Sequence, residues 1–439
     1  MKEAAVSKGF GVAVFAAVLC ACASPLASAQ STELDMVSAV RRVVSWHPAV
    51  AAAIGYARER EERIKIARAG YLPRIRAGVR SEYDNNESDR QIQRATISAS
   101  QMLFDFGKVS SSVEAAQAAA QAERARVWLA VDDVALDTLH AMIEIQRNRA
   151  LLGIAQEQVK GVSAIVDLAR KRSELGASAR SDEVQARARE EAARATELEV
   201  TARLDRWRGS LAALLGQPQD APPDVAADVP PWWMASCRID QPSWADAPAL
   251  QAAEADTSEA RALSRNARAH ALPTLSLDAE LNHALNHSIY RRQDVLVGLN
   301  VSMDLYQGGA QRSRALAAGH ALRAAEASAD RARFSLARDL AEARDQTAGL
   351  SQSLEVLGAR ERTIAETRDL YRHQYLSLGT RSLLDLLNAE QELHLSRFDR
   401  VNTVHDLRRL QADCLYSSGL LRERFGLNQR NIQGGDPAE

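Results

Sequence analysis

Apolar and polar residues alternate with a period of two in two separate parts of the chain. The clearer case runs from Leu275 to Met303, where apolar residues occupy every other position on both sides of a polar loop. A weaker version lies in the first half. This period is typical of β-strands with one apolar and one polar face. We therefore expect two β-hairpins, over residues 72–105 and 273–306.

Helical patterns surround both hairpins. Small and apolar residues recur every three to four positions, and proline is missing from residues 108–175 and 310–378. At a rise of about 1.5 Å per residue, helices of this length would each reach ~100 Å. We expect a shorter helix before each hairpin, and a return helix after each long helix, over 181–216 and 382–424.

The chain repeats itself at an offset of about 200 residues. Each copy has a Leu-Pro before its hairpin, an aromatic residue and a glycine after it, and a Leu-Gly before its return helix. The strand entry and exit positions are Pro73, Gly107, Pro273 and Gly309. We expect two repeats, over 30–217 and 245–427. The proline- and tryptophan-rich segment 218–244 would link them and fold irregularly against the helices.

Both ends of the chain are expected to lie outside the repeats. Residues 1–29 have the basic, apolar and small-residue regions of a secretory signal peptide, with a cleavage site after Ala29. Lipoprotein processing at Cys22 is the alternative. Residues 428–439 are expected to form a disordered tail.

Export would leave two cysteines in the mature chain, Cys237 and Cys414. An oxidising compartment would allow them to pair. Cys237 lies in the predicted linker, however, and Cys414 lies in a helical pattern near the end of the chain. We therefore expect two free thiols.

Composition argues against several classes of function. The formal net charge is -2, with basic and acidic residues interspersed along the predicted helices, so we expect no nucleic-acid partner. The close histidine pair His283 and His287 lies in a predicted loop, where a solvated pair is expected rather than a metal site. A glycine-rich phosphate loop and a nucleophile elbow are both missing, so we expect neither an enzyme nor a cofactor.

Four strands from one chain would leave two open sheet edges. Strands of about 8 to 12 residues with one apolar face have the length and pattern of tilted membrane-spanning strands. Three chains would together supply a 12-stranded barrel, which is within the usual range for outer-membrane proteins. A soluble hairpin packed on a core is the alternative, but the sequence shows no other apolar layer to cover it.

The chain resembles the TolC-like outer-membrane channel family. The resemblance rests on the signal peptide, the two repeats, the Leu-Pro strand entry, the Leu-Phe/Tyr-x-x-Gly strand exit, and the Leu-Gly-x-x-Ser-x-x-Asp motif from Leu378 to Asp385. It implies an α+β membrane protein with four β-strands and long antiparallel helices in each protomer. A homotrimer would form a 12-stranded barrel in the Gram-negative outer membrane, in contact with lipid, and an α-helical tunnel across the periplasm.

The resemblance also implies passive transport with two partners, a periplasmic adaptor protein and an inner-membrane transporter. The residues from Arg381 to Leu393 are similar to the branch that serves type I secretion of proteins by an ABC-type transporter. Small-molecule efflux with a proton-driven drug pump is the alternative within the family. A periplasmic helical adaptor or scaffold is the alternative from another class.

Residues at the turns between long and return helices receive roles from the same resemblance. Asp385 matches an inward-pointing aspartate that three-fold symmetry turns into a ring, and Arg381 matches an arginine that helps to hold the entrance closed. Asn388 replaces a second aspartate found in some members, so we expect weaker block by cations. The residues assigned to the adaptor-contacting tip are Gly176, Ala177, Ser178, Gly379, Thr380 and Arg381.

Spacing alone also predicts how the return helices begin. Ser178 or Ser181 can cap the first return helix. Thr380 or Ser382 can cap the second, where Ser382 and Asp385 have the spacing of a capping box. On this interpretation Asp385 has a structural role whether or not it lines a pore.

Overall fold

The unit that begins at Glu33 is built mainly from helices, with one four-stranded sheet. The expected signal peptide lies outside the described residues, and so does the expected tail except for Asn428 and Ile432. The computed structural model describes residues 33–83, 91–218, 224–238, 242, 244–285, 293–428 and 432.

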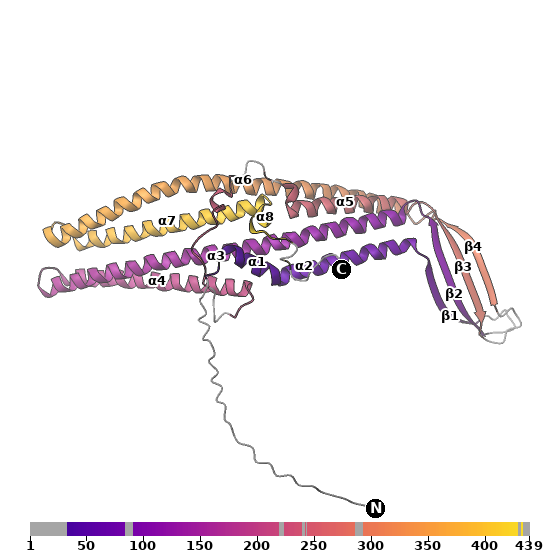
Figure 1. Cartoon of the computed structure of the whole chain (residues 1–439), viewed down its shortest axis with the longest axis horizontal. Coiled ribbons are helices and arrows are strands. Elements are labelled where there is room, and N and C mark those ends of the chain that lie inside the picture. The colour runs from indigo at the N-terminus through magenta and orange to yellow at the C-terminus, as the bar shows by residue number, and fades with distance from the viewer. Residues whose placement is uncertain are drawn as a thin grey trace, which may run out of the picture. The chain divides into compact units, whose positions relative to one another are not determined.

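Two long helices, each followed by a return helix, make up most of this unit (Figure 1). In the first repeat, the 67-residue helix α3 (Lys108–Glu174) is followed by α4 (Arg180–Leu214). In the second, the 64-residue helix α6 (Ala310–His373) is followed by α7 (Leu383–Ser417). Both pairs are antiparallel hairpins, as the proline-free segments predict.

α3 lies at the centre of the helical array and α6 at its edge. α3 packs against α2 (Pro48–Arg68), α4, α5 (Pro248–Ala269) and α7, whereas α6 packs against α5 and α7. α3 buries residues from end to end, but α6 buries only Leu336, Leu340 and Ala343. Most of α6 therefore presents its surface to the outside of a single copy.

One antiparallel sheet of four strands, in the order β1-β2-β3-β4, lies at one end of the helices (Figure 1). Its strands are β1 (Arg74–Tyr83), β2 (Gln91–Phe104), β3 (Thr274–Ala284) and β4 (Gln293–Ser302).

The register of the sheet gathers its apolar residues on one face. Ile97 on β2 lies opposite Ala77 on β1 and Leu281 on β3, and Leu281 in turn lies opposite Val295 on β4. These side chains remain exposed: Val295 is 72% accessible and Ile97 is 50% accessible. An uncovered apolar sheet face of this kind marks a surface that meets lipid or a partner.

The largest hydrophobic core lies where the linker and the first and last described helices meet α3. It joins α1 (Met36–Trp46), α3 and the short helix α8 (Leu421–Phe425). Trp233 of the linker is fully buried there, and the Trp232 ring meets the Phe425 ring edge-on at 5.3 Å. The linker thus folds against the helices, with short 3-10 turns at Trp233–Ala235 and Trp244–Asp246.

Three predicted helices are interrupted. The helix before the first hairpin is divided at His47, whose extended backbone precedes Pro48. The return helix predicted over 382–424 stops at Ser417, and Gly419 with a φ of 76° separates it from α8. The long helix predicted over 310–378 changes to a π-helical turn after His373.

The second hairpin is also shorter than predicted. β4 ends at Ser302 rather than near residue 306, because Ser302 pairs with Thr274, the first residue of β3. Residues beyond Ser302 have no partner strand within one copy. The apolar residue Met303, which continues the alternation, lies outside the strand.

The expectation of two free thiols is wrong. Cys237 and Cys414 form a disulfide, with their Cα atoms 5.3 Å apart. The linker crosses α7 at this point and brings together residues separated by 177 positions. Sequence position placed the two cysteines in different elements, and only the path of the linker makes them neighbours.

Candidate channel entrance

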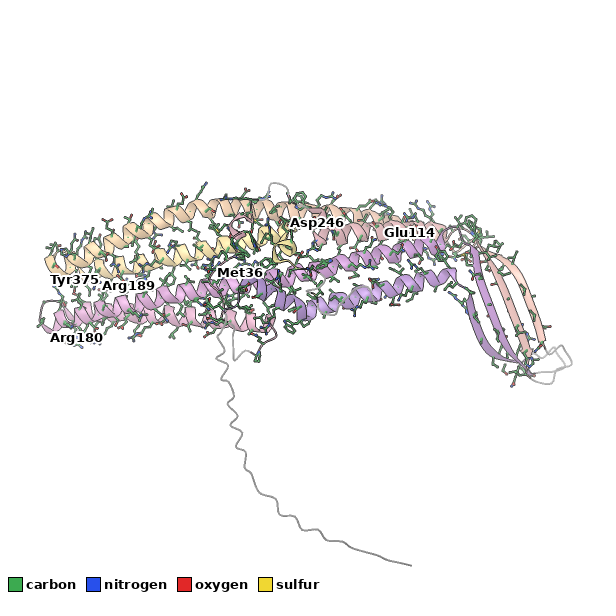
Figure 2. The ribbon with its side chains drawn as sticks, in the orientation of Figure 1. Met36, Glu114, Arg180, Arg189, Asp246 and Tyr375 are labelled. Atoms are coloured by element: carbon green, nitrogen blue, oxygen red, sulfur yellow. A yellow bond between two sulfur atoms is a disulfide. The ribbon has the colours of Figure 1, made fainter. Side chains whose placement is uncertain are left out.

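Two tight turns lie at the end of the helices opposite the sheet (Figures 1 and 2). We call them the tip turns: residues 175–179 between α3 and α4, and residues 374–382 between α6 and α7. Gly176 and Gly379 adopt the left-handed conformation, with φ of 70° and 63°. Glycine reaches these angles without the steric cost that a side chain brings.

The first tip turn closes by backbone hydrogen bonds alone. The amide of Ala177 donates to the carbonyl of Arg172 at 2.7 Å, and the amide of Gly176 donates to the carbonyl of Ser173 at 3.0 Å. α4 then begins without a side-chain cap, because Ala179 occupies the N-cap position. The prediction that Ser178 or Ser181 caps this helix is therefore wrong. Gly176 and Ala177 are exposed, and Ser178 is half-buried.

The second tip turn differs from the first in its approach. Its approach is a π-helical turn at Gln374–Leu378, and the amide of Thr380 donates to the carbonyl of Gln374 at 3.3 Å. The interval from Gly309 to Gly379 is one residue longer than that from Gly107 to Gly176. A π turn accommodates a single added residue within a helix, so this turn absorbs the difference between the repeats.

Ser382 and Asp385 form the predicted capping box at the start of α7. The amide of Asp385 donates to Ser382 Oγ at 3.2 Å, while the amide and the hydroxyl of Ser382 donate to Asp385 Oδ2 at 3.2 and 2.9 Å. Hydrogen bonds from Ser382, helped by the positive charge of Arg381, lower the pKa of the Asp385 carboxyl below its ordinary value. The side chain of Asp385 is still 40% accessible.

Arg381 is held within its own turn. Its guanidinium lies over the ring of Tyr371, 4.4 Å from the centroid, and its Nε donates to Gln374 Oε1 at 3.2 Å. The distance from Arg381 Nη1 to Asp385 Oδ2 is 3.9 Å. The guanidinium thereby connects α6, the π turn and the first turn of α7.

A contact between the two tip turns was not predicted from the sequence. The guanidinium of Arg172 lies 4.8 Å from the centroid of the Tyr375 ring and donates to the carbonyl of Tyr375 at 3.3 Å. Tyr375, visible at this end in Figure 2, is buried, and this burial raises the pKa of its hydroxyl. The surrounding apolar cluster comprises Val162, Ile165, Val166, Ala169, Ala186, Leu383, Leu386 and Leu387.

Further along the hairpins, Arg189 joins α4 to α7 (Figure 2). Its Nη1 donates to Gln391 Oε1 at 2.5 Å, and its Nη2 donates to Asn388 Oδ1 at 3.4 Å. Asn388 therefore contacts α4 of its own copy. A groove of about 200 Å³ opens beside this contact; it is lined by Gln158, Val162, Arg189, Ala192, Ala193, Thr196, Leu387, Gln391, Leu395 and Phe398.

A buried ionic cluster joins α6 and α7 behind the tip. Glu390 Oε1 lies 3.1 Å from His394 Nε2, and Glu390 Oε2 lies 3.2 Å from Arg368 Nη1. Burial alone would raise the pKa of Glu390, but the hydrogen bond from His394 and the charge of Arg368 outweigh it and lower the pKa. A Cβ atom on Gly161 would lie only 2.5 Å from Glu390 Oε1, so this glycine makes room for the carboxylate.

The strand entry and exit residues lie where the sheet joins the helices. Pro73 and Pro273 directly precede β1 and β3. Gly107 and Gly309 are the N-caps of α3 and α6, with φ of 91° and 82°. These four residues thus lie at the two corresponding junctions of the repeats.

Two kinds of feature are missing from the described residues. No helix there contains a stretch long and apolar enough to cross a membrane. No group of three or more His, Cys, Asp or Glu side chains there could hold a metal ion. Of the histidine pair considered above, His283 lies on β3 and His287 lies outside the described residues.

Both repeats match the family model of outer membrane efflux proteins, over residues 40–217 and 243–410. The chain belongs to this family. Its members are passive channels of the outer membrane that extend into the periplasm, so the chain is not an enzyme. The family forms trimeric channels that work with periplasmic adaptors and inner-membrane pumps.

Solved channels share the fold at low sequence identity. The outer membrane protein VceC from Vibrio cholerae is 17% identical, with a TM-score of 0.78, 88% of this chain covered and 96% of that chain. The CmeC outer membrane channel of Campylobacter jejuni is 13% identical, with a TM-score of 0.78 and coverages of 91% and 90%. The open-state MtrE channel of Neisseria gonorrhoeae is 18% identical, with a TM-score of 0.73 and 88% of both chains covered. No curated protein sequence matches the chain.

Proposed function

We propose that this outer membrane efflux protein is the exit duct for type I secretion of a protein. An ABC-type transporter in the inner membrane would drive export through a periplasmic adaptor and this passive channel. The observation that supports the proposal is the second tip turn, where the segment from Arg381 to Leu393 is similar to the secretion branch of the family. Small-molecule efflux is the second candidate, because the matching family model is that of efflux proteins.

The entrance of the duct would be controlled by the second tip turn. In a trimer, three copies of Asp385 would form a carboxylate ring that attracts cations at the constriction. The partial exposure of Asp385 and its place in the first turn of α7 support this role. Arg381 would keep the turn in its closed arrangement through its contacts with Tyr371 and Gln374. Asn388 would add no charge to the constriction.

The adaptor would bind at the tip turns. Gly176, Ala177, Gly379, Thr380 and Arg381 are all exposed. Small residues allow the backbone of another helical hairpin to approach closely. The groove beside Arg189 offers a neighbouring surface between the two hairpins of one copy.

Identification of the partners tests this proposal. The full-length tagged channel would be crosslinked in cells, purified, and its partners identified by mass spectrometry. We expect an adaptor and an ABC-type transporter, and we expect deletion of the channel to remove a protein from the culture medium. Recovery of a proton-driven pump, with lost drug resistance and an unchanged set of secreted proteins, would instead establish small-molecule efflux.

A further inference from the structure

Over most of its height, the polar face of the sheet separates its positive and negative charges by strand; Glu82, near the far end of β1, is the exception by register. The basic side chains are Arg74, Arg76 and Arg80 on β1 and Arg94 on β2. The acidic side chains are Asp278 and Glu280 on β3 and Asp294 on β4. The register places all of them on the face opposite the apolar one. We call the two sets the basic stripe and the acidic stripe.

Opposite charges lie at the same height along the strands. Arg74 pairs with Ser100, which pairs with Asp278, and Arg76 is related to Glu280 through Ser98 in the same way. An arginine and a carboxylate in one row are thus two strand spacings apart, ~10 Å. This separation is about one Debye length at 0.1 M salt. The stripes therefore neutralise each other only partly.

The carboxylates have neutral partners within one copy. The hydroxyls of Ser100 and Ser276 donate to Asp278 at 2.5 and 2.9 Å, and Asn282 Nδ2 donates to Glu280 Oε1 at 2.8 Å. Within the described part of the chain, no ion pair joins the basic stripe to the acidic stripe. The arginines keep their charge available to whatever occupies the space in front of the sheet.

That space becomes the lumen when the sheet closes into a membrane barrel. The apolar face must meet lipid, so the polar face turns inward. β1 and β4 are the open edges of one copy, and closure of a trimer places the basic stripe of one copy beside β4 of the next. On the polar face of β4, a Cβ atom added at Gly298 would have no atom of its own copy within 4 Å, apart from the adjacent residues. This position leaves room for an arginine side chain from the neighbouring copy.

We propose that the barrel lumen is divided into three basic and three acidic stripes that face one another across the pore. Such a lumen fits a substrate that carries both charges, because its acidic groups meet a basic stripe and its basic groups meet an acidic stripe at the same depth. A lumen of one sign would hold substrate groups of the other sign. This inference depends on the trimeric barrel of the family and not on which inner-membrane transporter drives export.

The test measures the local potential with charged thiol reagents. Gly78→Cys lies on β1 between Arg76 and Arg80, and Asn282→Cys lies beside Glu280 and opposite Asp294. Trimers in lipid vesicles would be labelled with membrane-impermeant methanethiosulfonates, one anionic and one cationic. Cys237 and Cys414 are paired, so they do not react, and Cys20 and Cys22 belong to the expected signal peptide. Val79→Cys on the apolar face is the matched control and should remain unlabelled.

We expect the ratio of anionic to cationic labelling rates to be about tenfold higher at position 78 than at position 282, and to shrink in high salt. Arg76→Gln with Arg80→Gln, in the Gly78→Cys background, should remove most of the preference at position 78. Arg63→Gln on α2, which lies outside the sheet, should leave the preference at position 78 unchanged. Equal ratios at the two positions would overturn the proposal of separate stripes. Labelling of Val79→Cys in place of Gly78→Cys would overturn the assignment of the polar face to the lumen.

Either failure would leave the identity of the transporter untouched. Conversely, a channel found to serve a drug pump would still show the two opposite labelling preferences. The labelling experiment and the partner experiment therefore fail independently.

Discussion

Asp385 takes part in a helix cap and in a proposed pore lining, and mutation can separate the two. Asp385→Asn removes the charge, whereas Ser382→Ala keeps the carboxylate and removes its hydroxyl partner. We expect block by divalent cations, measured on trimers in planar bilayers, to weaken strongly in Asp385→Asn and to persist in Ser382→Ala. Equal loss in both variants would indicate that block depends on the helix start rather than on the charge.

The pH dependence of the block gives a second test of the same residue. Hydrogen bonds from Ser382 lower the pKa of Asp385, so the charge persists below the ordinary pKa and is lost as pH falls through the lowered value. Ser382→Ala removes the largest cause of this shift. We expect the pH at which block is lost to rise in Ser382→Ala. Repulsion within a carboxylate ring would raise the Asp385 pKa in the wild type and in Ser382→Ala alike. The variant would therefore still have the higher Asp385 pKa.

Arg381 contacts only its own hairpin and its own turn in the described part of one copy. Its loss would remove this link between α6 and the start of α7. We expect Arg381→Ser to raise the resting conductance of reconstituted trimers. Arg381→Lys should raise it less, because lysine keeps the charge near Asp385 and the cation over the Tyr371 ring. An unchanged resting conductance in Arg381→Ser would leave this residue without a part in closure.

Local sequence patterns identify some of these contacts and not others. The capping box at Ser382 and Asp385 depends on residues three apart, and local spacing reveals it. The contact between Arg172 and Tyr375 joins residues 203 apart in sequence. A periodic pattern reports which face of its own helix a residue occupies, but not which residue of another hairpin it meets. For the same reason, the pattern does not show that Cys237 and Cys414, which lie 177 positions apart, are neighbours.

Among the elements, the second tip turn has the most demanding geometry. Gly379 has a φ of 63° directly after the π turn, and a β-branched residue there is a steric outlier. We expect Gly379→Val to impair export while trimers still assemble. Gly379→Asn is the matched control and should export more nearly normally, because asparagine adopts the left-handed conformation more readily than valine. Normal export by Gly379→Val, measured as secreted substrate in the medium, would show that the turn tolerates another conformation.

The linker is covalently bonded to α7 through Cys237 and Cys414. The disulfide closes a long segment of chain, and removing such a bond typically costs ~2–5 kcal/mol. We expect Cys414→Ser to lower the thermal unfolding temperature of the detergent-solubilised trimer. Reductant should lower the unfolding temperature of the wild-type protein to the value of the variant, and it should leave the unfolding temperature of the variant unchanged. Equal unfolding temperatures for oxidised wild type and Cys414→Ser would contradict a stabilising bond.

Element boundaries were predicted well where they depend on local sequence. Leu-Pro precedes both hairpins, and α3 runs from Lys108 to Glu174, close to the proline-free segment 108–175. The boundaries that differ depend on partners. β4 ends where β3 begins to pair, and the π turn follows from one added residue in the second repeat. Neither is visible in the alternation of apolar and polar residues.

At the scale of the whole molecule, one copy is an incomplete structure. The apolar face of the sheet is exposed, both sheet edges are open, and α6 buries little of its length. Exposed edges and apolar surfaces of this extent require covering. The trimeric channel of the family satisfies all three needs together, since closure covers the edges, lipid covers the apolar face, and neighbouring copies cover the helices.

The closure of the sheet can be tested by crosslinking its two edges. Gly78 on β1 and Gly298 on β4 lie on the polar face, at opposite edges of one sheet. Within one copy they are at least three strand spacings apart, ~14 Å. A bismaleimide shorter than this distance cannot join Gly78→Cys to Gly298→Cys in the same chain. It can join them only where β1 of one copy lies beside β4 of another.

We therefore expect the double variant to give covalent dimers and trimers on a denaturing gel after crosslinking in membranes. Each single variant should remain monomeric, because two like positions of a trimer are separated by whole sheets. Addition of detergent-denatured chains as a control would reveal random collision between copies. Monomers alone from the double variant, with both thiols accessible to a small maleimide, would contradict closure through these edges. Covalent products from a single variant would contradict the strand order on which the stripes depend.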